Sequence, residues 1–364
     1  MALRLMIPGP AEVSQEVLAV MGEPVRAHYG AEWTAIHNET LDLLRQVMRT
    51  RGKMFLMGGS GSLANDAAVS SFLRDGDKVI AGTNGMFGNR LIEIIRGAGG
   101  QVVEVRCEPG VPLAPCEFQE ALAQHPDAAL VAVVHLETST GVLNPVRPIA
   151  QAARSAGVPV MVDAVSSLAG TELPVDEWGI DICTSASQKC LGAPPGLAIV
   201  SVSPKGWEQM TRPGGRGWYL NLPLWDRYAI EWGDWHPFPV TMPTSVVLAL
   251  REGLRSIVTE GLPKRLARYA RLATRLRAGL RELGLPPVMS DADSAPVLTA
   301  AWVPDGTTST EIVDFLIREH GIQIARGFGE LRDRVIRIGH MGPVVDEALI
   351  DALLAGLRDF LARR

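Results

Sequence analysis

Over the first two hundred residues, short apolar runs alternate with longer segments in which apolar residues recur at helical spacing. Such runs are typical of strands buried on both faces, and their alternation with helices is typical of a mostly parallel sheet. The apolar runs lie at 54–57, 78–81, 102–105, 129–134, 158–162, Ile182–Ala186 and 197–202. Helical patterns between them include 64–73, 90–96 and 148–155. The pattern therefore predicts a large α/β domain built on a mostly parallel seven-stranded sheet.

The pattern changes after residue 203. Residues 204–243 contain five of the eight tryptophans together with many prolines and glycines, and we interpret them as long ordered loops. The later patterns are helices at 244–259, 263–283, 309–320 and 345–363 and strands at 297–302, 323–325 and 335–338. We place a domain boundary near residue 260. The expected division is a large domain over 1–260, whose N-terminal arm 1–15 lies near the small domain, and a smaller C-terminal α/β domain over 261–364.

The composition is that of an ordinary soluble protein with a large core. The chain has 364 residues, of which 47% are hydrophobic and 21% are charged. The net charge of −5 and the lack of a basic run argue against nucleic acid as a partner. No apolar stretch suits a signal peptide or a membrane span, and the four cysteines form no CxxC pair, so we expect reduced thiols and a cytoplasmic location. The seven histidines are scattered, so no metal site is indicated.

One lysine, Lys189, lies in a loop between the last two apolar runs and is soon followed by Gly192-Ala193-Pro194-Pro195-Gly196. These residues restrict the backbone of the loop, so the amine would be held in one place. A fixed amine of this kind suits a Schiff base with pyridoxal phosphate (PLP). A single loop lysine is more often an ordinary surface residue, so the choice between the two interpretations depends on the surrounding motifs.

Two of these motifs favour a bound cofactor. Gly58-Gly59-Ser60-Gly61-Ser62 lies directly after a strand and before a helix, where free N–H groups and the helix dipole favour an anion such as phosphate. The alternative is a glycine turn with a serine cap. Asp163 follows the strand 158–162, at the edge where open sheets bind ligands, and could face the pyridine nitrogen of PLP. Its alternative is a helix N-cap.

Two more residues could complete such a site. Phe87, in Gly85-Met86-Phe87-Gly88, could stack on a planar cofactor, although a core phenylalanine is the commoner case. Arg337 lies inside an apolar strand pattern, where an unpaired guanidinium is costly. It could hold a substrate carboxylate through two parallel hydrogen bonds, or it could form an internal salt bridge with Asp346 or Glu330.

Taken together, these motifs resemble the class V aminotransferases of PLP fold type I, in the branch that contains the alanine–glyoxylate, serine–glyoxylate and serine–pyruvate enzymes. The resemblance covers nearly the whole chain. It rests on Pro8-Gly9-Pro10, Gly59-Ser60-Gly61-Ser62, Gly85-Met86-Phe87-Gly88, His135-Leu136-Glu137-Thr138-Ser139-Thr140-Gly141, Val162-Asp163-Ala164-Val165-Ser166-Ser167, Ser187-Gln188-Lys189 and Arg337-Ile338-Gly339. It implies the fold type I architecture, PLP as cofactor and an active homodimer.

The resemblance also implies a role for each motif residue. Lys189 would bind PLP covalently, Asp163 would face the pyridine nitrogen, and Phe87 and Val165 would pack on the two faces of the ring. Thr138 would contact the ring hydroxyl, and Arg337 would bind the substrate α-carboxylate. The phosphate would be bound by Ser60, Gly61, Ser62 and Gln188, together with Thr241 of the partner subunit.

The implied reaction is transamination of a small amino acid, alanine or serine, with glyoxylate or pyruvate as acceptor. Arg337 supplies one carboxylate clamp, which suits donors without a distal carboxylate, although Arg326 could supply a second if its loop turns inward. Three positions depart from the family pattern. Phe87 replaces a commoner Trp or Tyr, Phe238 stands where the partner often donates an aromatic hydroxyl, and Arg326 stands at a frequent glycine.

Three alternative functions stay open on the sequence. The stretches 189–196 and Pro237-Phe238-Pro239 also resemble pyridoxamine–pyruvate aminotransferase, which uses the vitamin itself as substrate. A PLP lyase such as a cysteine desulfurase usually has a histidine before the lysine and a mobile cysteine, whereas this chain has Gln188 and a Cys190 adjacent to the lysine. A non-catalytic, hydrogenase-associated relative is the third, and the presence of both Lys189 and Asp163 argues against it.

Overall fold

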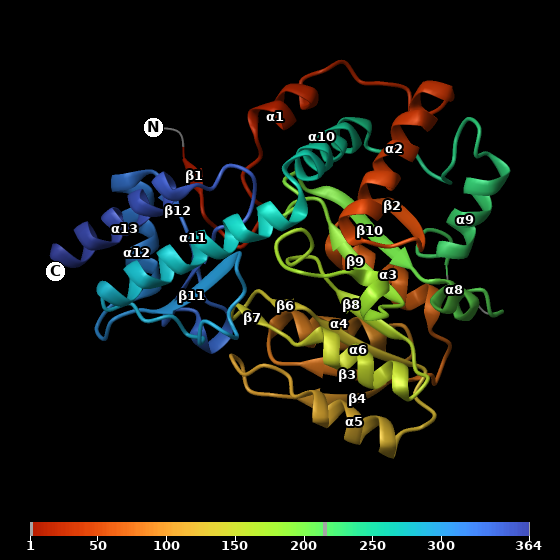
Figure 1. Ribbon diagram of the computed structural model, residues 1–364, viewed down its shortest axis with the longest axis horizontal. Helices are drawn as coiled ribbons and strands as arrows, with labels where there is room; N and C mark the ends of the chain where they lie inside the picture. Colours follow the sequence, from red (N-terminus) through yellow and green to blue (C-terminus); the bar gives the residue numbers. More distant parts are fainter. Residues whose placement is uncertain (1–2, 214–216, 364) are drawn as a thin grey trace.

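The computed structural model describes residues 3–213 and 217–363, and the remaining six positions of the predicted arm, loops and C-terminal domain lie outside this description. Figure 1 shows two lobes, a larger one around a central sheet and a smaller one that contains the C-terminal elements, drawn in blue. Within the described residues, no helix is long and apolar enough to cross a membrane. The larger lobe carries most of the sequence motifs.

The central sheet has seven strands, as the apolar runs predicted. Their order across the sheet is β2 (Lys53–Gly59), β10 (Gly196–Val202), β9 (Ile182–Ala186), β8 (Val160–Asp163), β5 (Leu130–Val134), β3 (Lys78–Thr83) and β4 (Gln101–Arg106). Only β10 runs antiparallel to its neighbours β2 and β9, so the prediction of a mostly parallel sheet is confirmed. Every residue of β5, β8 and β9 is buried, which explains why these strands read as continuous apolar runs.

Helices cover the sheet of the larger lobe. They are α1 (Gln15–Met21), α2 (Ala31–Met48), α3 (Gly61–Phe72), α4 (Met86–Gly97), α5 (Pro115–Gln124), α6 (Val146–Ser155), α7 (Val175–Trp178) and α10 (Thr244–Glu260). α3 and α4 pack against each other and against the sheet, and α5 packs against α6. A short hairpin of β6 (Leu136–Glu137) and β7 (Val142–Leu143) leaves the end of β5. The chain therefore returns repeatedly to the carboxyl edge of the sheet through short loops.

The tryptophan-rich segment is more regular than predicted. It contains α8 (Pro204–Met210) and α9 (Leu222–Glu231), so the prediction of long ordered loops is wrong for these two stretches. Both helices begin with a proline in the first turn and a capping side chain. Ser203 accepts a hydrogen bond from the N–H of Gly206, and Asn221 accepts one from the N–H of Leu224. These caps supply the start signals that the proline and glycine content of the segment obscures.

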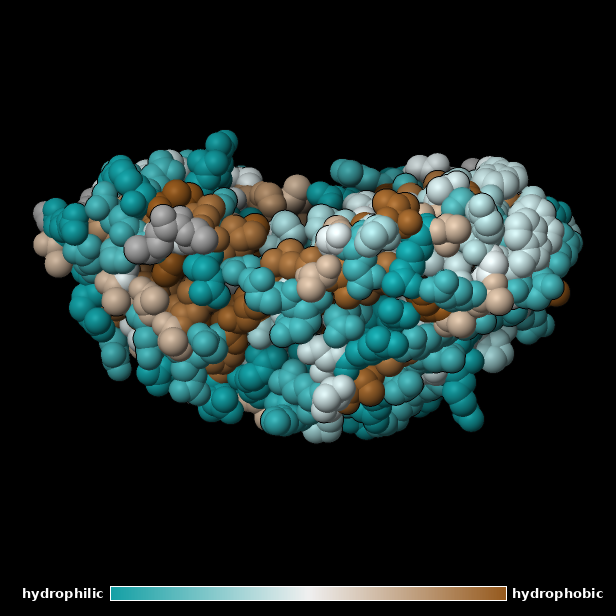
Figure 2. Space-filling model, turned by 90° about the horizontal axis from the view of Figure 1, so that it is seen from above, coloured by the Kyte–Doolittle hydropathy of each residue, from teal (hydrophilic) through white to brown (hydrophobic). Residues whose placement is uncertain are grey.

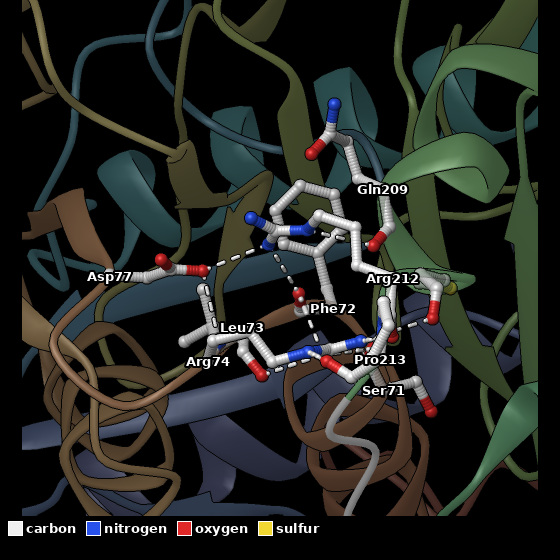
Figure 3. Close-up of polar contacts among 9 residues, drawn as sticks. Ser71, Phe72, Leu73, Arg74, Asp77, Gln209, Arg212 and Pro213 are labelled. Atoms are coloured by element: carbon white, nitrogen blue, oxygen red, sulfur yellow. Dashed lines mark hydrogen bonds and ion pairs between the residues drawn. The ribbon is translucent and has the colours of Figure 1, made fainter.

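Arg74 and Arg212 fasten residues 212–213, which follow α8, to the end of α3 (Figure 3). The Arg74 guanidinium donates to the carbonyl oxygens of Leu73 (2.9 Å) and Pro213 (2.7 Å). The Arg212 guanidinium donates to the carboxylate of Asp77 at 3.0 Å. Carbonyls at a helix end lack partners within the helix, and here Arg74 satisfies that of Leu73 while Arg212 donates to that of Phe72 at 3.2 Å.

The smaller lobe has a three-stranded antiparallel sheet in the order β11 (Leu298–Trp302), β14 (Val335–Gly339) and β13 (Ala325–Arg326). Its helices are α11 (Leu262–Glu282), α12 (Ser309–Phe315), which continues as a π-helical turn (Leu316–His320), and α13 (Glu347–Ala362). The predicted strand 323–325 is divided. β12 (Ile322–Gln323) pairs in parallel with β1 (Arg4–Leu5), whereas β13 pairs with β14 (Figure 1).

Separate apolar clusters fill the two lobes. The larger cluster includes side chains from Trp33 to Ile257, and a second cluster combines Met6 with side chains from Leu272 to Phe360. A third, small cluster that includes Ala11, Cys190 and Tyr269 lies between them. We keep the division near residue 260, with an N-terminal arm near the small domain, as a proposal.

Candidate active site

A cavity of about 230 Å³ lies at the carboxyl edge of the central sheet. It is lined by Ser60, Gly61, Ser62, Phe87, Thr138, Asp163, Val165, Gln188 and Lys189, and also by Asn65, Arg90 and Ser166. The fold therefore brings together every residue predicted to contact the cofactor except Thr241. A wider cavity of about 600 Å³ adjoins it, because Phe87, Thr138 and Lys189 line both, and Arg337 lines this second space. We call the wider space the substrate cavity.

Lys189 follows β9 and places its amine between the two lobes. Its Nζ donates a hydrogen bond to the carbonyl oxygen of Pro8. Gly9 has φ +110°, and a Cβ at this position would lie 2.4 Å from Nζ, so only glycine allows this approach. Burial lowers the pKa of Lys189 to about 8, despite opposing contributions from Cys190 and Asp163. The amine is consequently available in its neutral, nucleophilic form close to neutral pH.

Asp163 is buried at the end of β8, and two donors fix its carboxylate. Oδ2 accepts from the amide of Asn65 at 2.7 Å, and Oδ1 accepts from the N–H of Val165 at 2.9 Å. The Asn65 side chain is itself oriented by the hydroxyl of Thr184, 2.5 Å from its oxygen. Burial raises the pKa of Asp163, while the hydrogen bonds from Asn65 and Val165 and the nearby Lys189 counteract this rise. The result is an oriented carboxylate that offers negative charge to a cationic group in the cavity.

Asn65 and Thr184 were missed in the sequence analysis. Asn65 lies on the buried side of α3 among alanines, where a polar side chain needs a partner, and this position was the available signal. Its partner Asp163 is 98 residues away along the chain, so the sequence gives no direct indication of their contact.

The glycine–serine loop forms one end of the smaller cavity, where α3 begins. Ser60 caps the helix by accepting from the N–H of Leu63. A Cβ on Gly61 would lie 2.6 Å from a Val165 methyl group, so glycine lets the first helical turn pack closely against the cavity. The side-chain oxygen of Gln188 is buried here without a hydrogen-bond partner. A helix N-terminus and two hydroxyls are donors that suit a phosphate group, and Gln188 could add to them through the NH₂ donors of its amide, since the amide oxygen only accepts.

Glu137 is a fully buried carboxylate that links several parts of the site. It accepts hydrogen bonds from the N–H groups of Phe87 and Gly88, both at 3.0 Å. It also accepts from the N–H and the hydroxyl of Ser139. Burial raises the pKa of Glu137 against these hydrogen bonds. The carboxylate therefore fixes the start of α4, which carries Phe87, and the peptide that carries Thr138. In the sequence, Glu137 is recognisable only as part of the motif 135–141, which indicates no role for it.

Arg337 extends from β14 into the substrate cavity and is 6% exposed. Its Nη1 donates to the carbonyl oxygen of Thr138 (2.9 Å), and its Nε donates to that of Arg326 (2.7 Å). Its guanidinium carbon lies 4.1 Å from the ring centre of Phe328. Among the described residues no carboxylate pairs with it, so the internal salt bridge that the sequence left open is not formed. Burial lowers the pKa of Arg337 to about 10, and the guanidinium is free to bind an incoming carboxylate.

Three other predicted residues do not line the smaller cavity, in which the cofactor residues meet. Thr241 is exposed and lines neither cavity of its own chain. Phe238 is 1% exposed and packs between the rings of His37 and His236, so it presents no surface to another subunit. Arg326 is exposed at the outer end of the substrate cavity, where its Nη1 donates to the Thr310 hydroxyl at 3.1 Å.

Two further features limit the chemistry of the site. Within residues 3–213 and 217–363, no cluster of His, Cys, Asp and Glu side chains could hold a metal ion. Cys190 is fully buried beside Lys189, where its thiol contacts the Ser166 carbonyl, and burial raises the pKa of this thiol to about 12. A buried thiol in its protonated form is a poor nucleophile.

Comparisons with known proteins agree with this geometry. The family model of the class V aminotransferases matches residues 8–330. An uncharacterized aminotransferase of Methanocaldococcus jannaschii is 36% identical over 93% of this chain and 87% of its own length. A soluble hydrogenase small subunit of Synechococcus is 34% identical over 96% of this chain and 91% of its own length. The alanine–glyoxylate aminotransferase of Oryctolagus cuniculus is 33% identical over 98% of this chain and 92% of its own length.

Solved structures show the same fold. The ureidoglycine–glyoxylate aminotransferase of Bacillus subtilis superposes with a TM-score of 0.94 at 32% identity, covering 100% of this chain and 94% of that one. The pyridoxamine–pyruvate aminotransferase of Mesorhizobium loti gives a TM-score of 0.92 at 27% identity, covering 100% and 93%. Both matches place the fold in PLP fold type I, as the motifs implied. The chain therefore belongs to the class V aminotransferases and is an aminotransferase with PLP as its cofactor.

Proposed function

We propose that this enzyme transfers the amino group of a small amino acid, alanine or serine, to glyoxylate or pyruvate. The observation that carries the proposal is Arg337, one buried guanidinium without a carboxylate partner, in the same cavity as the Lys189 amine. Such a guanidinium fits the α-carboxylate that all amino and 2-oxo acids share. Relatives named for alanine–glyoxylate and ureidoglycine–glyoxylate transfer support glyoxylate as an acceptor.

The residues of the smaller cavity fit PLP. The start of α3 at Gly61, the hydroxyls of Ser60 and Ser62 and the side-chain NH₂ of Gln188 would hold its phosphate. The remaining assignments are Lys189 for the covalent link, Asp163 for the pyridine nitrogen, Thr138 for the ring hydroxyl, and Phe87 and Val165 for the ring faces. When bound, PLP supplies an electron sink for the negative charge that develops at the substrate Cα.

The side chains of this chain would perform three tasks around the substrate. Arg337 would hold the α-carboxylate and so orient the Cα–H bond toward Lys189. The Lys189 amine, whose pKa is lowered to about 8, would accept the proton from Cα as a general base. Asp163, held by Asn65, would stabilise positive charge on the ring nitrogen throughout.

A second candidate is the transfer of an amino group from pyridoxamine to pyruvate. The similarity to the Mesorhizobium loti structure favours it. The desulfurase alternative receives no such support, because the Cys190 thiol is buried and protonated. The third alternative, a non-catalytic hydrogenase-associated protein, rests on the similarity to a hydrogenase subunit. Lys189 and Asp163 line one cavity, however, and this supports a catalytic site.

A panel of donors tests these assignments. Purified holoenzyme would be assayed with alanine, serine, glutamate, aspartate and pyridoxamine, each against glyoxylate, pyruvate and 2-oxoglutarate. We expect alanine or serine with glyoxylate or pyruvate to give the highest kcat/KM. Burying a second carboxylate without a partner costs several kcal/mol, so the dicarboxylic donors should be poor. Glutamate with 2-oxoglutarate as the best pair would refute the proposal and direct attention to Arg326.

We further propose a cytoplasmic homodimer in which Thr241 completes the site of the other subunit. Exposed apolar side chains include Leu18, Val25, Trp218, Ile230 and Trp235. Figure 2 shows apolar patches on the face seen from above, the side on which α1 lies. Clustered exposed apolar residues are typical of subunit interfaces. Sedimentation at assay concentration should give a dimer, and a fully active monomer would contradict this assignment.

A further inference from the structure

Phe328 lies between the substrate cavity and a separate apolar cavity. The separate cavity has a volume of about 530 Å³. Its walls are mostly apolar and include Met86, Val288, Trp302 and Leu331, and the charged Glu330 and Arg334 also line it. Phe328 lines both spaces. Two short stretches of chain form the rest of the wall between the cavities. Phe87 and Thr138 line the substrate cavity, and their neighbours Met86 and Ser139 line the apolar one.

The Phe328 ring is 37% exposed, and two groups of the site contact it. The Arg337 guanidinium lies 4.1 Å from its ring centre, and the Phe87 ring lies edge-on at 6.4 Å. The loop that carries it is tight, because the carbonyl oxygen of Phe328 accepts from the N–H of Leu331 at 3.0 Å. At Gly327, a Cβ would lie 2.1 Å from the Leu331 carbonyl oxygen, so this position requires glycine.

We propose that Phe328 determines substrate size by closing the substrate cavity against the apolar cavity behind it, an inference that rests on the proposed transamination at Lys189. With the ring in place, a donor bound to Arg337 has no access to the apolar space, which keeps small side chains preferred. Without the ring, the side chain of leucine would reach a cavity lined by Met86, Val288 and Trp302. Each methylene buried there gains about fourfold in binding, so leucine, with three more carbons than alanine, could gain about sixtyfold.

The same ring also supports Arg337 directly. A cation placed over an aromatic face is stabilised by it, and this contact pre-orients the guanidinium that binds the α-carboxylate. Loss of the ring should therefore weaken binding of every donor, independently of side-chain size. These two effects can be separated, because a leucine at position 328 keeps most of the wall but removes the aromatic face.

Three variants separate size selection from the support of Arg337. F328A should raise the ratio of kcat/KM for leucine to that for alanine at least tenfold over wild type. F328L should lower kcat/KM several-fold for both donors and leave their ratio unchanged. L331A is the matched control, because Leu331 lines the apolar cavity alone and its truncation enlarges that cavity without opening the wall. We expect L331A to leave the ratio at the wild-type value.

Titration of each holoenzyme with alanine and leucine, followed by the visible absorption of the cofactor, reports binding without an acceptor. It also shows that each variant holds its cofactor. The proposal would be overturned if F328A left the preference for leucine over alanine unchanged in both kcat/KM and binding affinity. It would also be overturned if L331A changed this preference as much as F328A does. A wild-type enzyme that neither binds nor converts alanine would refute the proposed function instead, and the affinity of F328A for leucine would still decide the role of Phe328.

Discussion

Replacing Glu137 with glutamine tests whether one buried carboxylate organises the site. The carboxylate accepts from the N–H groups of Phe87, Gly88 and Ser139 and from the Ser139 hydroxyl. Glutamine keeps the shape but exchanges one acceptor oxygen for an NH₂ donor. If that donor faces Phe87 and Gly88, two N–H groups lose their acceptor. If it faces Ser139, the N–H of Ser139 loses its acceptor, while the Ser139 hydroxyl can rotate and accept a hydrogen bond from the new NH₂ group.

The second orientation costs less and should be adopted. A buried donor left without a partner costs about 1–3 kcal/mol, and hydrogen bonds to a neutral amide are weaker than those to a carboxylate. We therefore expect E137Q to lower the free energy of unfolding by about 2–4 kcal/mol. The carboxylate also fixes the peptide that carries Thr138, whose carbonyl oxygen orients Arg337, so KM for amino donors should rise in the variant.

Urea denaturation of the PLP-free proteins measures the first effect, and steady-state kinetics measures the second. S139A is the matched control, because it removes one of the four donors and leaves the carboxylate in place. Its loss of stability should be smaller, about 1 kcal/mol. An E137Q protein with the urea midpoint, the PLP affinity and the KM of wild type would refute the reasoning.

Three further predictions concern Lys189 and Arg337. K189A should abolish transamination and leave the urea midpoint nearly unchanged; turnover at the wild-type rate would disprove the assignment. Because burial lowers the pKa of Lys189 to about 8, the PLP-free protein should take up PLP about tenfold faster at pH 9 than at pH 7, as the neutral amine increases. A rate independent of pH, measured by stopped-flow absorbance, would contradict this pKa. R337A should raise KM about 10–100-fold for every donor without changing their ranking, and unaltered KM values would exclude the clamp.

The sequence predicted those parts of the fold that depend on local pattern. Buried strands such as Ile182–Ala186 are continuous apolar runs, and all seven were recognised. The helices at Pro204–Met210 and Leu222–Glu231 were missed because proline and glycine content outweighed the short caps that start them. Residues 323–325 were predicted as a single strand, because no local feature indicates that the residues on either side of Ile324 pair with different strands.

The same distinction holds for the candidate site. Lys189 lies in a loop and Asp163 ends a strand, both within motifs whose own residues indicate their chemistry, and both line the cavity. Asn65 and Thr184 act through contacts 98 and 119 residues apart, which only the folded chain creates. Phe328 could not be placed between two cavities from sequence, because that position depends on how the smaller lobe packs against the larger one.

The pairing of β1 with β12 has a consequence for the order in which the protein is made. Arg4 and Leu5 are synthesised 318 residues before their partners Ile322 and Gln323. The central sheet has all its strands by Val202, so the larger lobe can fold while the N-terminal strand still waits for its partner. Pro8, which accepts from the Lys189 amine, is held next to that strand. The surroundings of the reactive lysine are therefore completed only after Gln323 has been synthesised.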